Sequence, residues 1–248
     1  MAGWAGVLFD LFGTLVTFEP ARLPTIAVEG RAVHSTLGAL QPLLADVVPD
    51  VALGEAWQAL ATVSEEMAGA RGYDHVELPS RERFRRMLVR VGCPDDRSDE
   101  GAVLLSRAHM RCIADATILP DGHGALLAAV RRHHRTALVS NFDDTATAYD
   151  ILGRHGLLPY LEVVVVSEAL GLRKPHPALA RVPLRELRLA PAEALFVGDT
   201  FAEDVGAAHA AAVDAAWIDV RGTGVPDGAQ PPRLVLRRLR DLAPHLGV

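Results

Sequence analysis

Four groups of polar residues each follow a short apolar run, and their types suit nucleophilic attack on an anionic substrate. Asp10 ends the first run, Ser140 and Asn141 end the second, Lys174 lies in the loop after the third, and Asp199 ends the fourth. A free aspartate has a pKa of about 3.9, so Asp10 is expected to be an ionised nucleophile that needs no partnering base. The lysine supplies positive charge, and an aspartate is a ligand type that suits a divalent cation.

Lys174 is the only lysine among the 25 Lys and Arg residues of the chain. A compact ammonium on a flexible stem can reach over a strand end where a planar guanidinium fits less readily. We therefore predict that Lys174 directs its charge at Asp10 and the substrate.

These residues need a scaffold that brings strand ends together. Both faces of the apolar runs are hydrophobic, which predicts buried parallel strands, and helix-period segments lie between the last four runs. Strand alternating with helix predicts an open, doubly wound sheet, whose ligands lie at the carboxyl ends of the strands. The five predicted strands are Gly6–Asp10, Thr136–Ser140, Val163–Ser167, Ala194–Asp199 and Ala215–Val220.

The interval from about Pro20 to Asp115 breaks this alternation and predicts helices alone. Ser98, followed by two acidic residues, is the expected start of the last of them. The predicted helical segments are Arg22–Leu44, Leu53–Ala70, Ser80–Gly92 and Ser98–Ala116.

The fold class that follows is α/β, a doubly wound Rossmann-like parallel sheet core with an inserted all-α helical cap domain. The predicted core comprises residues 1–17 and 116–248, and the cap comprises residues 18–115. At the end of the chain, residues 221–228 indicate a loop, and residues 232–246 predict a final helix packed on the core.

Composition excludes several function classes. The formal charge of −6, without a basic patch interleaved with aromatic residues, disfavours a nucleic-acid partner. No apolar run approaches the roughly 20 residues of a membrane span, and the N-terminus lacks the charged region of a signal peptide. Cys93 and Cys112 form no CxxC motif, which disfavours a disulfide scaffold or zinc site and favours the cytoplasm.

The segments DLFGT, VSN, RKPHP and GDTFAED, in this order, resemble the four motifs of the haloacid dehalogenase (HAD) superfamily. The similarity spans residues 6–16 and about 116–220, and the insert lies where the C1-type subgroup of that family has its helical cap. The resemblance implies a nucleophilic Asp10, oxyanion contacts from Thr14 and Ser140, and charge neutralisation by Lys174.

The resemblance also implies Mg²⁺ as cofactor, held by Asp10, the main-chain carbonyl of Phe12, Asp199 and Asp204. A carboxylate that approaches a phosphate dianion meets like charge, and a bridging cation turns that repulsion into attraction. Glu203 competes with Asp204 for its role. Four residues are expected to line the substrate pocket, namely Phe12, Gly13, Asn141 and, from the cap, Arg31.

Phe12 departs from the phosphatase branch of the family, in which a second aspartate usually stands two residues after the nucleophile. That aspartate protonates the leaving group, and general acid–base help of this kind is worth about 10²- to 10⁴-fold. One hypothesis is therefore a Mg²⁺-dependent phosphohydrolase that acts on an activated phosphate or takes its acid from the cap, water or substrate. Candidate acids are Glu19, Asp143 and Asp144.

A second hypothesis is a 2-haloacid dehalogenase, because halide leaves without a proton and an aromatic residue stands at this position in such enzymes. Arg31 would then clamp the substrate carboxylate. A phosphonate hydrolase would need a cap lysine, and the cap has none. In dehalogenases the residues of the fourth motif resemble the sequence SSN, whereas this chain has Asp199 and Asp204 there, which suit a cation. The sequence therefore favours the phosphohydrolase.

The favoured function is hydrolysis of a small phosphorylated metabolite through an aspartyl-phosphate on Asp10. The alternatives are a dehalogenase acting on a halocarboxylate and a non-catalytic HAD-fold protein that binds a ligand or partner, although retention of Asp10, Lys174 and Asp199 speaks against the latter. The expected assembly is a monomer or homodimer.

Overall fold

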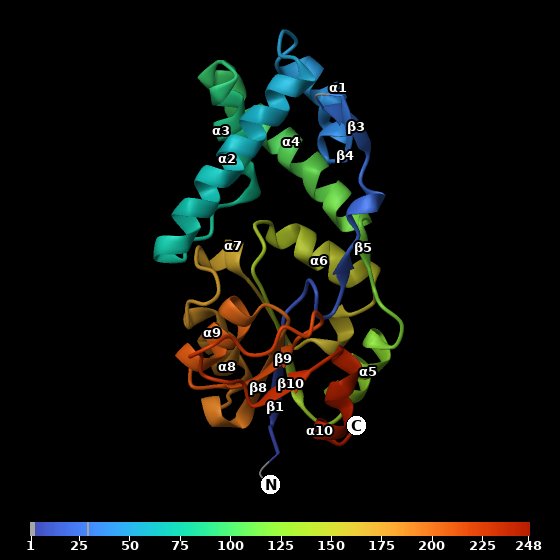
Figure 1. The fold of residues 1–248 in the computed structure, drawn as a ribbon, viewed down its shortest axis with the longest axis vertical. Helices are drawn as coiled ribbons and strands as arrows, with labels where there is room; N and C mark the ends of the chain where they lie inside the picture. The colour runs from blue at the N-terminus through green and yellow to red at the C-terminus, as the bar shows by residue number, and fades with distance from the viewer. Residues whose placement is uncertain (1–2, 29) are drawn as a thin grey trace. The chain divides into compact units, whose positions relative to one another are not determined.

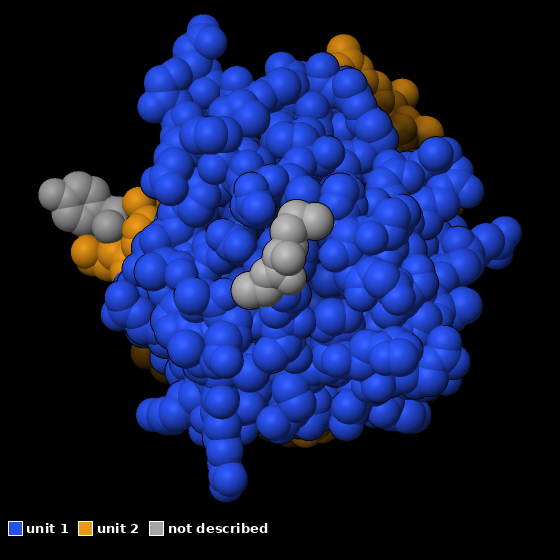
Figure 2. Space-filling model, turned by 90° about the horizontal axis from the view of Figure 1, so that it is seen from below, with its two compact units in different colours: residues 1–17, 118–248 blue, residues 18–117 orange. Residues whose placement is uncertain are grey.

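The computed structural model describes residues 3–28 and 30–248, and the chain forms two compact units. Unit 1 comprises Met1–Thr17 and Ile118–Val248, and unit 2 comprises Phe18–Thr117 (Figure 2). The chain passes between them at β2 (Thr17–Phe18) and β5 (Thr117–Ile118), which pair as a two-stranded sheet. No helix in the described part of the chain is long and apolar enough to cross a membrane.

Unit 1 is built on a six-stranded parallel sheet in the order β10-β9-β8-β1-β6-β7 (Figure 1). β1 lies between β6 and β8, at the point where the strand order reverses and where such sheets bind ligands. All five predicted strands are present. The strands are β1 (Gly6–Phe9), β6 (Arg135–Ser140), β7 (Val163–Val166), β8 (Ala194–Gly198), β9 (Asp214–Ile218) and β10 (Leu234–Leu236).

Helices cover both faces of this sheet, which confirms the doubly wound architecture. α8 (Ala178–Leu187) and α9 (Gly206–Ala210) lie on one side, and α5 (His123–Arg131) and α10 (Ala243–Leu246) lie on the other (Figure 1). Leu8 and Phe196 are among the strand residues that pack with α8 and α9 in one buried cluster. The remaining helices of the unit are α6 (Thr145–Arg154) and α7 (Ser167–Leu170), with short turns η2 (Leu158–Tyr160) and η3 (Pro191–Glu193).

The predicted C-terminal helix over residues 232–246 is wrong. β10 instead adds to the sheet beside β9, with Leu234 opposite Ala216 and Leu236 opposite Ile218, and η5 (Leu239–Leu242) and α10 follow it. The helical spacing of Leu239, Leu242 and Leu246 comes from these turns, whereas backbone pairing with β9 decides the residues before them.

In unit 2 a short turn, η1 (Pro20–Arg22), is followed by a hairpin and not by the predicted helix over residues 22–44. β3 (Thr25–Val28) and β4 (Arg31–His34) pair antiparallel, and α1 (Leu37–Val47) starts only after them. β-branched residues favour strands, and Gly30 takes a φ of +76°, which suits a tight connection. The insert is therefore not helical throughout.

The other helices of unit 2 are α2 (Leu53–Asp74), α3 (Ser80–Arg90) and α4 (Asp95–Asp115). The predicted start of the last helix at Ser98 is wrong by three residues, because Pro94 precedes the first turn. The Ser98 hydroxyl donates back to the carbonyl of Asp95 at 3.0 Å, so it stabilises the turn from inside the helix.

Candidate active site

The polar residues at three neighbouring strand ends meet at one edge of the sheet. Phe9 is level with Leu138 on one side and Val197 on the other, so Asp10 leaves β1 between the ends of β6 and β8. The backbone N–H of Asp10 donates to the carbonyl of Val197 at 2.9 Å, which extends the pairing by one residue. Parallel pairing thus carries Asp10, Ser140 and Asp199 to a common edge.

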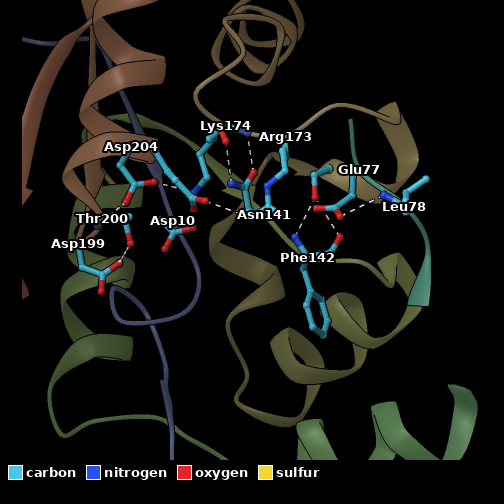
Figure 3. A network of polar contacts seen from close by, with 12 residues as sticks. Asp10, Glu77, Leu78, Asn141, Phe142, Arg173, Lys174, Asp199, Thr200 and Asp204 are labelled. Carbon is cyan, nitrogen blue, oxygen red and sulfur yellow. Dashed lines mark hydrogen bonds and ion pairs between the residues drawn. The ribbon is translucent and has the colours of Figure 1, made fainter. Parts of the chain in front are cut away.

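Lys174 reaches into this edge and lies between two carboxylates (Figure 3). Its Nζ donates to Oδ1 of Asp10 at 2.5 Å, to Oδ1 of Asp204 at 2.7 Å and to the carbonyl of Val139 at 3.1 Å. The side chain is only 2% exposed, so its charge acts on these partners with little screening. All three ammonium protons therefore have acceptors.

Asn141, predicted to contact substrate, instead holds the lysine loop. Its Oδ1 accepts from the backbone N–H of Lys174 at 2.7 Å, and its Nδ2 donates to the Lys174 carbonyl at 3.1 Å. This reciprocal pair uses both polar ends of the amide. Asn141 therefore acts on the site by positioning Lys174.

Asp10, Asp199 and Asp204 form an acidic cluster in which one oxygen of each lies within 4.8 Å of the others. Asp204 lies in the first turn of the π-helix η4 (Phe201–Val205), which follows β8. Its Oδ1 contacts Lys174, and its Oδ2 accepts from the backbone N–H of Thr200 at 2.8 Å. Asp199 is half-buried and accepts from the Thr200 hydroxyl at 3.3 Å.

Two glycines allow the backbone to pass close to these carboxylates. Gly13 has a φ of +78°, and a Cβ built on it would overlap the Asp199 carboxylate. A Cβ on Gly198 would likewise overlap the carboxylate of Asp204. Gly13 therefore lets the backbone after β1 pass close to the Asp199 carboxylate.

The buried cluster shifts the protonation of its members. Burial raises the pKa of Asp10 to about 7, with Asp204 and Asp199 adding to the rise and Lys174 opposing it. Burial also raises the pKa of Asp199, and Asp204 adds to that effect. Although burial alone lowers the pKa of Lys174, Asp10 and Asp204 raise it above its ordinary value. The ordinary pKa assumed for Asp10 from the sequence therefore does not hold in this environment.

The hydroxyls of Thr14 and Ser140 are buried at this edge without a hydrogen-bond partner among the described residues. Each residue is 1% exposed. Buried polar atoms are nearly always bonded in folded proteins, so an unbonded pair beside a candidate nucleophile indicates donors kept for a ligand. This is the arrangement expected for contacts to an oxyanion.

Phe12 is half-buried, and its ring packs against Phe142 with the centroids 5.1 Å apart and the planes at 60°. Phe142 is fixed by Ser167, whose Oγ accepts from its N–H at 2.9 Å and donates to its carbonyl at 3.1 Å. Phe142 was not among the site residues predicted from the sequence. A signal existed, because Phe142 follows Ser140 at the same two-residue offset by which Phe12 follows Asp10.

The other candidates take different places. Arg31 lies exposed on β4 of unit 2, on a strand and not a helix, and Glu19 is exposed. Asp144 caps α6 by accepting from the N–H of Thr147 at 2.8 Å, while Asp143 is buried. Glu203, the competitor of Asp204, pairs with Arg173 at 3.1 Å.

Comparisons with known proteins agree on the family and on the fold. A family model described as haloacid dehalogenase-like hydrolase matches residues 4–212. A phosphoserine phosphatase of Thermus thermophilus is 33% identical over 165 residues, which cover 66% of this chain and 64% of that protein. A phosphoglycolate phosphatase of Escherichia coli is 26% identical over 98% of this chain and 92% of its own length. A 2-haloacid dehalogenase structure from Pseudomonas syringae superposes with a TM-score of 0.74 at 21% identity, covering 100% of this chain and 99% of that one.

Proposed function

Because the chain belongs to the haloacid dehalogenase-like hydrolases, we propose that it is a Mg²⁺-dependent phosphohydrolase that forms an aspartyl-phosphate on Asp10. The observation that carries this proposal is the acidic cluster of Asp10, Asp199 and Asp204. Three carboxylates and the one ammonium of Lys174 leave two negative charges uncompensated when all are ionised. A buried site of that charge favours a divalent cation.

The residues present fit Mg²⁺, since the donors are carboxylate oxygens, and Asp10 and Asp199 each have an oxygen that neither Lys174 nor Thr200 binds. Asp10, Asp199 and the carbonyl of Phe12 would hold the ion, while Asp204 keeps Lys174 and the Thr200 N–H. When bound, the ion would withdraw charge from the phosphoryl group and offset its repulsion by Asp10.

The side chains of this edge then have defined tasks. Asp10 attacks phosphorus through one oxygen of its carboxylate. The ammonium of Lys174 and the free hydroxyls of Thr14 and Ser140 donate to the phosphoryl oxygens, where charge accumulates in the transition state. Asn141 keeps the lysine in place. Water then attacks phosphorus of the aspartyl-phosphate, inorganic phosphate leaves, and the Asp10 carboxylate is restored.

The relatives support a small anionic substrate, since the names of two of them specify phosphoserine and phosphoglycolate. A small phosphorylated metabolite is therefore our proposed substrate class. A location in the cytoplasm, the absence of a nucleic-acid partner and a monomeric or homodimeric state remain predictions from the sequence.

The proposal is tested with acetyl phosphate and 4-nitrophenyl phosphate, with Mg²⁺ and with EDTA. We expect Mg²⁺-dependent phosphate release and, after acid quench, a phosphoryl adduct on the peptide that contains Asp10. Asp10→Asn should abolish both and keep the circular dichroism spectrum of the wild type. Undiminished phosphate release from Asp10→Asn would contradict the proposal.

A second candidate, 2-haloacid dehalogenase, is favoured by the aromatic pair Phe12–Phe142 beside the nucleophile. Attack on carbon expels halide and needs neither a proton nor a cation. Chloride release from 2-chloropropionate in EDTA would support this candidate, whereas the phosphohydrolase is expected to release none.

A further inference from the structure

We propose that Trp217 is a positioning residue for the cation site, and that it acts through the peptide group that joins Asp199 to Thr200. Trp217 lies on β9, outside the four motif segments of the sequence. The inference rests on the proposed function, because it concerns the residues that would hold Mg²⁺. It follows from the hydrogen bonds at the two ends of this one peptide group.

Both polar atoms of the peptide group between Asp199 and Thr200 are hydrogen-bonded. The carbonyl of Asp199 accepts from the indole N–H of Trp217 at 2.9 Å. The N–H of Thr200 donates to Oδ2 of Asp204 at 2.8 Å (Figure 3). Because a peptide group is planar, the bonds to its oxygen and to its nitrogen together fix its orientation. Trp217 therefore holds the backbone group that connects two members of the acidic cluster.

The indole of Trp217 is itself held in place by the sheet. Trp217 pairs in register with Gly198 of β8, and only 5% of it is exposed. The ring of Phe201 packs edge-on against the indole, with the centroids 5.1 Å apart and the planes at 80°. A buried indole N–H usually finds a hydrogen-bond acceptor, and here the acceptor is the first residue after β8. The indole thus ties the end of β8 to the neighbouring strand.

Side-chain packing leaves Asp199 less firmly fixed than its backbone. A cavity of about 340 Å³ has Asp199, Thr200, Phe201 and Trp217 among its lining residues. The hydrogen bond that the Asp199 carboxylate accepts from the Thr200 hydroxyl is long, at 3.3 Å. The bond from Trp217 to the main chain is therefore expected to limit how far Asp199 can move into this space.

The position of Asp199 matters because Mg²⁺ requires nearly ideal octahedral geometry, so a displaced carboxylate binds it poorly. Residues that hold a metal ligand without touching the metal typically change metal affinity or activity by about 10- to 100-fold when they are substituted. A loss of that size is expected when the indole N–H of Trp217 is removed.

The test is a calorimetric titration of Mg²⁺ into the metal-free protein, with two matched variants. Trp217→Phe removes the indole N–H and keeps an aromatic ring against Phe201. Trp4→Phe removes an equivalent bond, from the indole of Trp4 to Oδ2 of Asp214 at 2.9 Å, at the amino end of β9. We expect the Kd for Mg²⁺ to rise about 10- to 100-fold in Trp217→Phe and to stay at the wild-type value in Trp4→Phe. Both variants should lower the urea midpoint in EDTA by similar amounts, because each loses one hydrogen bond.

Steady-state kinetics give a second measurement. The Mg²⁺ concentration for half-maximal phosphate release should rise in Trp217→Phe, and its kcat should approach the wild-type value when Mg²⁺ saturates the site. A third measurement uses the double variant Trp4→Phe/Trp57→Phe, in which Trp217 is the only tryptophan. Its fluorescence emission should change as Mg²⁺ binds, with the half-saturation that calorimetry gives. This measurement decides the question if Trp217→Phe does not fold, and constant emission while Mg²⁺ binds would then contradict the inference.

The outcomes separate this inference from the proposed function. Unchanged Mg²⁺ affinity in Trp217→Phe would overturn the inference while the phosphohydrolase stands. An equal loss of affinity in Trp4→Phe would also overturn it, because the effect would then come from a general loss of stability in unit 1. If the wild type binds no Mg²⁺ and EDTA leaves its phosphate release unchanged, the proposed function fails and the inference fails with it.

Discussion

One threonine and one serine of strand β6 show that a buried hydroxyl can serve either the stability of the fold or the function of the site. Thr136, at the start of β6, is fully buried and donates its hydroxyl to the carbonyl of Tyr160 at 2.6 Å. Ser140, at the end of the same strand, is equally buried and has no partner among the described residues. A buried polar group without a hydrogen bond destabilises the fold by about 1–3 kcal/mol. A functional site keeps such a group when a bound ligand supplies the missing hydrogen bond.

We therefore expect opposite effects from two matched substitutions. Ser140→Ala should leave the free energy of unfolding unchanged or slightly higher and lower kcat/KM by about 10²-fold or more, because it removes a donor to the transition state. Thr136→Val should lower the free energy of unfolding by about 1 kcal/mol and leave kcat/KM unchanged. Urea denaturation and steady-state kinetics measure both. Equal loss of stability in the two variants would show that the Ser140 hydroxyl is already bonded in the free protein.

At the scale of elements, the loop after β1 depends on a backbone conformation that only glycine adopts readily. Gly13 and Gly122 have φ angles of +78° and +83°, but a Cβ would meet the Asp199 carboxylate at Gly13 and nothing within 4 Å at Gly122. Gly13→Ala and Gly122→Ala should both lose about 1 kcal/mol of stability from the left-handed conformation. Only Gly13→Ala should also weaken Mg²⁺ binding in a calorimetric titration, because Asp199 must move. If the two variants bound Mg²⁺ with similar affinity, the loop that carries Gly13 would have no part in shaping the cation site.

Helix α3 gives a prediction about pH. Hydrogen bonds from Arg85, and then from Arg86, lower the pKa of Glu82 from 4.5 to about 2 although burial opposes them. The pairs are partly exposed, with N–O distances of 2.8 and 2.7 Å. Because the folded-state pKa is depressed, this stabilisation is complete above pH 4.5 and is lost as the pH falls towards 2.

Glu82→Gln should thus lower the free energy of unfolding at pH 7 by up to about 1 kcal/mol, and the difference from wild type should vanish near the lower end of that range. The exposed Glu65 on α2 serves as a control, and Glu65→Gln should change stability little at either pH. Chemical denaturation at several pH values measures both. A Glu82→Gln deficit that persists at low pH would contradict the ionic origin of the effect.

At the scale of the whole molecule, the proposed Mg²⁺ ion would be held by residues from two strands of the central sheet, and it would stabilise the folded state by mass action. At a free Mg²⁺ concentration about 100 times the dissociation constant, Mg²⁺ binding should raise the free energy of unfolding by about 2.7 kcal/mol. Asp199→Asn should abolish that increase and, without Mg²⁺, be at least as stable as the wild type, because it removes charge from a crowded acidic cluster. The exposed Asp150, paired with Arg154 on α6, provides the control Asp150→Asn, which should keep the Mg²⁺ effect. Thermal and urea denaturation with Mg²⁺ or EDTA measure the shift.

Short-range patterns in the chain were sufficient for the five buried strands, the α/β class and the order of the motif residues. A run such as ALFVG is apolar on both faces wherever it is placed, so its assignment needs no knowledge of its neighbours. The same reasoning failed for β10, because three residues become a strand only when the edge of β9 is available to them. It failed for β3 and β4 because helical and strand patterns overlap in short apolar segments.

The relations among the site residues came only from the tertiary structure. Lys174 and Asp10 are 164 residues apart in the chain. The motifs alone do not reveal that the ammonium of Lys174 binds two carboxylates, or that the Asn141 side chain binds the backbone of Lys174. The packing of Phe12 on Phe142 depends in the same way on two separate strands ending side by side. Residue types and spacing determine which groups are available for chemistry, whereas distances, burial and the raised pKa of Asp10 arise once the sheet brings them together.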